Sequence, residues 1–304
     1  MNLTHPPIRT SRLATLAALF AVYLFWGGTY LGIRLAVRTI PPFLMAGSRF
    51  LIAGLAVAGY AALRAPRRPG WVQWRDAGIV GALLLLGGNG ILSWAEQRVP
   101  SNLAALLIAT VPLWMVLMAL PGRNGRRPSP LLTLGLGLGF AGIAVLVRPG
   151  ADSGIDPLGA GALLLAALCW SAGSIYSRRA RLPEPPLLAV GLQMIVGGAL
   201  LIGVSAGAGE WRRLQLAAVA PESWLGLGYL VLFGSIVAYN AYIWLLKHAD
   251  PGWVSTYAFV NPVVAVFLGW LVAGERLTPR AWASTLIIVL SVAVITFDRN
   301  RKAA

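Results

Sequence analysis

The sequence predicts an all-α membrane protein, with ten transmembrane helices arranged as two inverted five-helix repeats. The first observation behind this prediction is composition: of 304 residues, 58% are hydrophobic and only 12% are charged, with a mean hydropathy of +0.73. A soluble domain carries about 25% charged residues. So few charges cannot solvate a globular surface, and lipid must therefore surround much of the chain.

The second observation is a series of ten apolar stretches, each close to the roughly 20 residues that a helix needs to cross a bilayer. A closed β-barrel would require short strands of alternating polarity, whereas these stretches are apolar on all sides. Helices are therefore predicted near residues 13–34, 42–63, 77–96, 102–120, 130–147, 158–177, 187–206, 224–246, 252–273 and 280–297.

The third observation is an internal repeat. Each predicted repeat, residues 1–148 and 157–297, holds five helices, so the two must cross the membrane in opposite senses. Inverted repeats are typical of transporters. A shift of 144 residues pairs Trp26 with Trp170, Arg34 with Arg178, and Gly47, Gly54 and Gly59 with Gly191, Gly198 and Gly203, and a shift of 150 pairs Pro112 with Pro262.

Basic residues indicate the orientation. With the N-terminus inside, sixteen Lys and Arg fall in cytoplasmic segments and eight on the opposite side, as the positive-inside rule requires. The net charge of +15 is thus explained by membrane topology, and no nucleic-acid partner is expected. We expect a multi-pass protein of the cell inner (plasma) membrane with both termini cytoplasmic. The single cysteine, Cys169, excludes a disulfide within one chain.

Polar residues within the predicted spans are candidates for transport, because each needs a partner or a task there. Asn89, Ser93 and Glu96 share one helix face. They indicate either a polar cavity lining or hydrogen bonds between helices. Arg49 is the only basic residue clearly inside a span. It is expected to pair, with Glu96 as one partner, to face water, or to bind a substrate carboxylate.

Aromatic residues repeat in the same way. Tyr23, Trp26 and Tyr30 share a face of the first predicted helix. Trp26 and its repeat mate Trp170 lie near mid-span, too deep for the aromatic belts of the membrane interface, which favours a cavity or a gate. A further polar and aromatic face in the eighth predicted helix comprises Ser235, Tyr239 and Tyr242.

Two prolines occupy corresponding helices of the two repeats. Pro112 and Pro262 each remove a backbone hydrogen bond. Such interruptions point to the binding region or gate of a transporter, although a proline can also simply kink a helix. Asn261 is placed to bond a freed carbonyl or a substrate, and Tyr257 lies one turn earlier on the same face.

Several motifs together resemble the EamA family of the drug/metabolite transporter superfamily, especially its YedA-like branch, over nearly the whole chain. They are Trp26-Gly-Gly-Thr-Tyr-Leu-Gly-Ile-Arg34, Pro41-Pro42, Gly47-Ser-Arg49, Gly88-Asn-Gly90, Trp94-Ala-Glu96, Val99-Pro-Ser101, Ala109-Thr-Val-Pro-Leu113, Gly234-Ser235, Asn240-Ala-Tyr242, Val260-Asn-Pro262 and Gly274-Glu275. The resemblance implies a ten-helix transporter with a central cavity that moves metabolites or amino acids, often outward. The first repeat has Leu120-Pro-Gly-Arg123 where the second has Glu275, so the repeat is degenerate there.

These observations predict a secondary transporter, with export as the expected direction, that moves a small metabolite or amino-acid-like substrate by alternating access. No Walker motif is present, and no cofactor or metal is expected. The alternative is an integral-membrane enzyme acting on a lipid or prenyl substrate. Such an enzyme needs clustered Asp, His or Cys, whereas His5 and His248 stand far apart, so no enzyme is expected. A channel is a third reading, and homodimerisation is left open.

Overall fold

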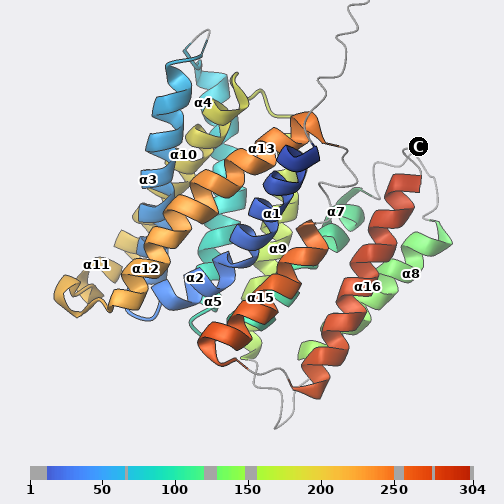
Figure 1. Ribbon diagram of the computed structural model, residues 1–304. Coiled ribbons are helices and arrows are strands. Elements are labelled where there is room, and N and C mark those ends of the chain that lie inside the picture. Colours follow the sequence, from blue (N-terminus) through green and yellow to red (C-terminus); the bar gives the residue numbers. More distant parts are fainter. Residues whose placement is uncertain are drawn as a thin grey trace, which may run out of the picture.

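In the computed structural model, the described residues form helices joined by turns and loops, and they contain no β-strand (Figure 1). Seven helical segments within these residues are long and apolar enough to cross a membrane, and three shorter apolar helices accompany them. Each of the ten overlaps one predicted stretch, so the all-α prediction is confirmed, while ten membrane crossings remain a prediction. The described residues are 12–65, 68–119, 129–147, 156–249, 257–275 and 278–301.

We call residues 12–147 the N-terminal half and residues 156–301 the C-terminal half. The N-terminal half contains α1 (Arg12–Gly27), α2 (Thr29–Ala36), α3 (Pro42–Ala62), α4 (Trp71–Gly81), η1 (Ala82–Gly90), α5 (Ile91–Ala95), α6 (Ser101–Ile108), α7 (Val111–Ala119) and α8 (Pro130–Val147). The C-terminal half contains α9 (Pro157–Ser177), α10 (Pro186–Gly207), α11 (Glu210–Arg213), η2 (Leu216–Ala218), α12 (Pro221–Tyr229), η3 (Leu230–Val237), α13 (Ala238–His248), α15 (Tyr257–Ala273) and α16 (Pro279–Arg301). Six of these helices begin at a proline, whose fixed φ suits the first helical position and whose missing N–H is not needed there.

Several predicted spans are not single regular helices. The first changes direction at Gly28, between α1 and α2, and the fourth is interrupted between α6 and α7. The third and eighth each contain a π-helical segment, η1 and η3. Hydrophobic periodicity did not reveal these segments, because one added residue shifts the pattern too little to be read from sequence. π-Helical turns within α-helices occur frequently at functional sites.

The two prolines behave differently from the expected pair of breaks. The interruption near Pro112 lies just before it, between α6 and α7. There the Thr110 hydroxyl donates to the Leu107 carbonyl at 2.6 Å. Pro262, in contrast, lies inside α15, which continues past it to Ala273. The helix therefore continues through Pro262, although this residue has no N–H to donate.

The most extensive helix contact among the described residues is that of α3 with α10, which joins the two halves. A Cβ added at Gly198 would lie 3.1 Å from the Gly47 carbonyl oxygen, and one added at Gly54 would lie 3.1 Å from the Gly191 carbonyl oxygen. The contact is reciprocal, because these are the glycines that the internal repeat pairs. Small residues allow such close approach of helices within a membrane.

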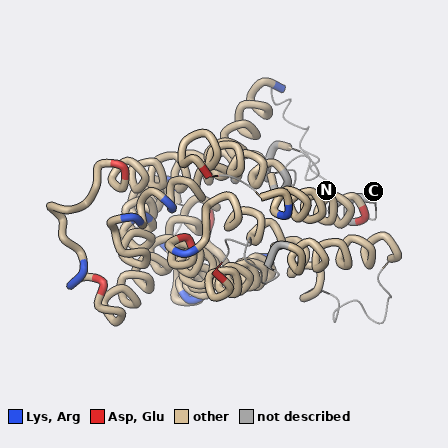
Figure 2. The backbone as a smooth tube through the Cα atoms, turned by 90° about the horizontal axis from the view of Figure 1, so that it is seen from below, with Lys and Arg blue, Asp and Glu red and all other residues tan. Residues whose placement is uncertain are grey.

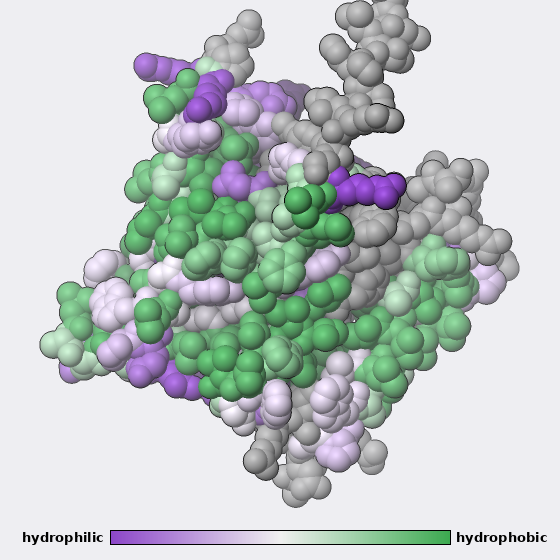
Figure 3. Space-filling model, viewed as in Figure 1, coloured by the Kyte–Doolittle hydropathy of each residue, from purple (hydrophilic) through white to green (hydrophobic). Residues whose placement is uncertain are grey.

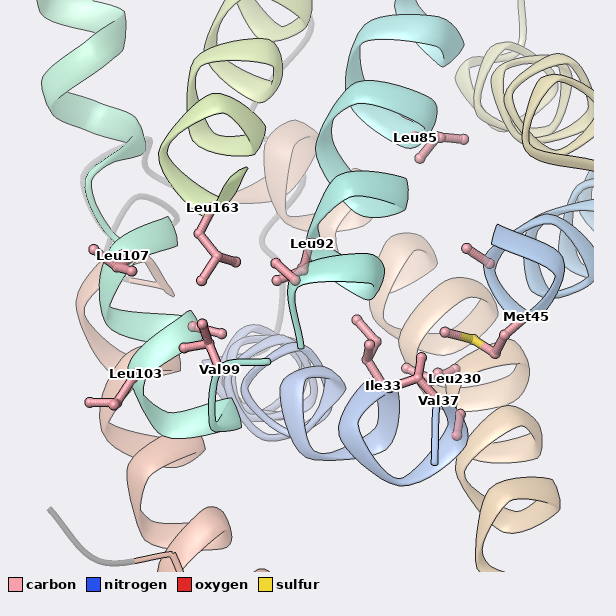
Figure 4. Packing of buried hydrophobic residues seen from close by; sticks show 14 of the residues in the cluster. Ile33, Val37, Met45, Leu85, Leu92, Val99, Leu103, Leu107, Leu163 and Leu230 are labelled. Carbon is pink, nitrogen blue, oxygen red and sulfur yellow. The ribbon is translucent and has the colours of Figure 1, made fainter. Parts of the chain in front are cut away.

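The α3–α10 pair lies toward one side of the molecule (Figure 1). Buried apolar side chains fill the space between α2, α3, α5, α6, α9 and η3 (Figure 4). The helices α8 and α16 pack on each other at one side of the molecule (Figures 1 and 2). Hydrophobic residues cover the middle of the visible face, and hydrophilic residues gather above and below it (Figure 3). Long uncharged stretches separate the few charged residues (Figure 2), as expected for helices that lie in lipid.

Gly198→Ala is expected to lower the melting temperature of the detergent-purified protein, because its Cβ would also lie 2.9 Å from the Leu51 amide nitrogen. Overpacking of this kind costs roughly 1–3 kcal/mol. Gly203→Ala is the matched control in α10, since an added Cβ there meets nothing within 4 Å. Equal melting temperatures for the two variants would contradict a tight α3–α10 contact.

Candidate functional site

An aromatic cluster, formed by Trp26, Tyr239, Tyr242 and Tyr257, lies where α1, α13 and α15 meet. The Trp26 ring centroid lies 5.3 Å from that of Tyr239, 5.0 Å from that of Tyr242 and 5.5 Å from that of Tyr257. Edge-on and tilted pairs at these distances are favourable. Trp26, Tyr239 and Tyr257 were predicted to line a site. Tyr242 was recognised on the same helix face as Tyr239, and the structure adds it to the cluster.

The indole of Trp26 is fixed by a hydrogen bond to the other half of the chain. Its Nε1 donates to the Gly234 carbonyl oxygen at 3.0 Å, within η3. Next to Trp26, the Thr29 hydroxyl donates to the Trp26 carbonyl at 2.6 Å, at the junction of α1 and α2. The orientation of the ring therefore depends on the irregular backbone of both segments.

Trp170 occupies a related but separate place. It packs on η1, where a Cβ added at Gly88 would lie 2.9 Å from its Cε3 atom. Trp26 thus contacts the π-helical segment of the C-terminal half, and Trp170 contacts that of the N-terminal half. Among the described residues, no ring contact joins Trp170 to the aromatic cluster.

Arg49 is buried, with 4% of its surface exposed. Its Nε donates to the Ser235 hydroxyl at 2.9 Å, and its guanidinium carbon lies 4.7 Å from the centroid of the Phe50 ring. The expected ion pair with Glu96 is not formed: within the described ranges, no carboxylate oxygen lies within 4.0 Å of this guanidinium. The two side chains interact electrostatically at longer range.

Glu96 directly follows α5, at the end of the continuous helical segment formed by α4, η1 and α5. It is fully buried, and in the described part of the chain neither of its carboxylate oxygens has a hydrogen-bond partner. Its backbone carbonyl accepts a hydrogen bond from the Arg34 guanidinium. Electrostatic interactions connect the carboxylate to Tyr30, Arg34, Arg49 and Glu275. A buried acceptor without a partner is costly, so Glu96 is available to a ligand or to a moving side chain.

Two other predicted residues of this face bond within their own helix. The Asn89 amide donates to the Leu84 carbonyl at 3.2 Å, and the Ser93 hydroxyl donates to the Asn89 carbonyl at 2.8 Å. Among the described residues, neither side chain makes a hydrogen bond to another helix.

The backbones of α15 and α1 approach each other closely. A Cβ added at Gly27 would lie 3.2 Å from the Asn261 backbone oxygen. Asn261 is buried, and its side-chain oxygen has no partner among the residues described. Near Pro112, the Ser171 hydroxyl of α9 donates to the Val111 carbonyl at 3.1 Å. The two proline regions therefore contact different neighbours.

Glu275 forms a contact between the halves that the sequence did not predict. Its carboxylate accepts hydrogen bonds from the Ser101 amide at 2.9 Å, the Asn102 amide at 3.1 Å and the Ser101 hydroxyl. It thereby satisfies the first N–H groups of α6, whose positive end favours an anion. Gly274, with a φ of 66°, allows the chain to turn after α15. We call this contact the Glu275 clamp.

Two further carboxylates connect the halves in the same way. Glu210 accepts from the Leu44 amide at 2.8 Å and from the Phe43 amide at 3.4 Å, at the start of α3. Asp76 accepts from the Arg181 amide at 2.8 Å. Each of the three bonds satisfies a backbone N–H group, and the one at Leu44 is buried.

Comparison with known proteins agrees with this architecture. The model of the EamA-like transporter family matches residues 13–148 and 157–297. The chain is 40% identical over 289 residues to the inner membrane transporter YedA of Escherichia coli (strain K12), covering 94% of this chain and 92% of that one. It is 23% identical over 296 residues to the transporter YoaV of Bacillus subtilis (strain 168), covering 93% and 97%.

A solved crystal structure has the same fold, with a TM-score of 0.62 at 24% identity over 94% of this chain and 98% of that one. The family match covers far more than half of the chain, in two adjoining segments. The chain therefore belongs to the EamA-like transporter family and is a multi-helix membrane transporter.

Proposed function

We propose that the protein is a secondary transporter of the inner membrane that exports a small metabolite or amino-acid-like substrate by alternating access. The observation that carries this proposal is the aromatic cluster around Trp26, which the two halves build together and which η3 connects to the buried side chain of Arg49. Ligand sites are commonly apolar and aromatic, with a few convergent polar groups.

The proposed architecture has ten transmembrane helices in two inverted repeats, residues 1–148 and 157–297. Three reciprocal features support it. The paired glycines of α3 and α10 contact each other across the halves, Trp26 and Trp170 each contact the other half's π-helical segment, and η1 and η3 occupy corresponding spans. In the helix contact, Gly47 meets Gly198 and Gly54 meets Gly191, so each glycine contacts the repeat mate of the other, as an approximate two-fold relation between the halves would require.

The substrate is proposed to bind between α1, α13 and α15, near η3 and the end of α5. Aromatic faces bind flat, apolar and cationic groups, while Arg49 and Glu96 supply charges. The proposed lining consists of Trp26, Tyr30, Asn89, Ser93, Glu96, Trp170, Ser235, Tyr239, Tyr242, Tyr257 and Asn261, with Pro112 and Pro262 in the helices that move.

Alternating access requires one end of the bundle to close while the other opens. The Glu275 clamp connects α6 and α15, which come from different halves, and we assign it to the closed outer end. The charge distribution supports this side, with both termini cytoplasmic. The corresponding sequence of the N-terminal half, Leu120–Arg123, has no acidic residue and lies outside the described residues.

Trp26→Ala is expected to raise the KM of transport about tenfold, because it removes the ring at the centre of the aromatic cluster. The measurement is uptake of radiolabelled amino acids into proteoliposomes, tested as a panel. Trp282→Ala is the matched control, since that indole is 57% exposed on α16. Flux that rises linearly without saturation would contradict a carrier.

Glu275→Ala is expected to open the outer end, because it removes the acceptor for the Ser101 and Asn102 amides. Ala104, fully buried in α6, is replaced by cysteine in a Cys169→Ser background. A membrane-impermeant maleimide added to intact cells should then label it several-fold faster than in the same background with Glu275.

Glu210→Ala serves as the control for this experiment. It also removes a carboxylate that bonds helix-start amides, but at α3, which the proposal keeps fixed. It should lower thermal stability without accelerating labelling. Equal acceleration by both variants would show that labelling reports general loosening, and the gating role of the clamp would be wrong.

A further inference from the structure

Arg49 is a buried cation that no carboxylate of the described residues contacts. Its Nε bonds the neutral hydroxyl of Ser235. Within the described part of the chain, Nη1 and Nη2 make no hydrogen bond, and no carboxylate lies within 4.0 Å. Two strong donors on one edge of the guanidinium are therefore available.

This arrangement is energetically unusual. A charge inside a membrane helix is costly, and arginine does not lose its proton in proteins. An anion that binds the free edge would offset much of this cost. The spacing of the two Nη groups allows them to donate two parallel hydrogen bonds to one carboxylate.

Two residues of η3 determine where the Arg49 guanidinium lies. Ser235 comes from the other half of the chain and fixes Nε, while Gly234 leaves room for the guanidinium: an added Cβ would lie 3.1 Å from Nη2. The same Gly234 accepts the hydrogen bond of Trp26. Adjacent residues of η3 therefore hold both the cation and the aromatic cluster, which places them at one site.

The geometry points to Arg49 as the residue that recognises the substrate, by binding a carboxylate whose attached apolar group contacts the aromatic cluster. This inference rests on the proposed transport function and deepens it by naming a charge that the substrate carries. The competing role, a counter-ion for Glu96, predicts no preference for an anionic ligand, because the two side chains would then satisfy each other.

Three ligands of one shape separate these roles: 3-phenylpropionate, its neutral amide 3-phenylpropanamide, and the cation 3-phenylpropylamine. Binding to the detergent-purified protein is measured by tryptophan fluorescence and by the shift in melting temperature. The acid is expected to bind at least about tenfold more tightly than the amide or the amine, the factor that a charged hydrogen bond commonly supplies.

Arg49→Gln is expected to abolish this preference, and Arg49→Lys to retain part of it, because lysine keeps the charge but lacks the planar fork. Gly234→Ala, which displaces Nη2 without removing charge, should weaken binding of the acid more than that of the amide. It also serves as the test if Arg49→Gln does not fold. Arg38→Gln, at an exposed position, is the control and should bind like the wild type.

Equal binding of acid and amide by the wild type would overturn the inference, as would a preference that survives Arg49→Gln, or no binding of the acid at millimolar concentration. The assay needs neither membrane nor gradient, so its failure is distinct from failure of the transport proposal. Acid-selective binding without flux in proteoliposomes would refute transport alone. Saturable flux without acid preference would refute the carboxylate site alone.

Discussion

The contact between α3 and α10 is the constraint on which the other helices depend. Its glycines bring two backbones from opposite halves so close that an added Cβ at Gly54 or Gly198 would meet both backbone and side-chain atoms of the facing helix. The neighbours then follow reciprocally, since α3 also packs against η3 and α10 against η1. Arg49 leaves α3 directly toward η3, where Ser235 receives it. The site is therefore positioned by a side chain that extends from this close helix contact.

Hydrogen bonding within the membrane-facing segments divides the polar residues into two groups. Ser48, Ser93 and Ser174 return their hydroxyls to carbonyls of their own helices, which satisfies them without specifying a partner. Glu96 and the outer edge of Arg49 lack such bonds in the described residues. Polar groups without hydrogen-bond partners are energetically costly in a protein surrounded by lipid. They usually persist because they have a function.

The sequence allowed the helix positions to be predicted, because apolar length can be read along one helix, while the role of Trp26 in a cavity or gate stays a prediction. It could not reveal that Arg49 bonds Ser235, 186 residues away, nor that Trp26 and Trp170 would each contact the π-helical segment of the other half. Such pairings depend on how helices cross. The π-helical segments could not be predicted, because one added residue barely changes the hydrophobic pattern. The Glu275 clamp was not predicted, because Glu275 has no acidic counterpart in the first repeat.

The bonds formed by Glu210 and Glu275 have a consequence for how the protein is made. The amides of Phe43 and Leu44 find their acceptor 166 or more residues later in the chain, and those of Ser101 and Asn102 wait for Glu275. At a synthesis rate of roughly 5–20 residues per second, the delay is on the order of ten seconds. The N-terminal half therefore enters the membrane with helix ends that only the C-terminal half can complete, and assembly finishes after insertion rather than during it.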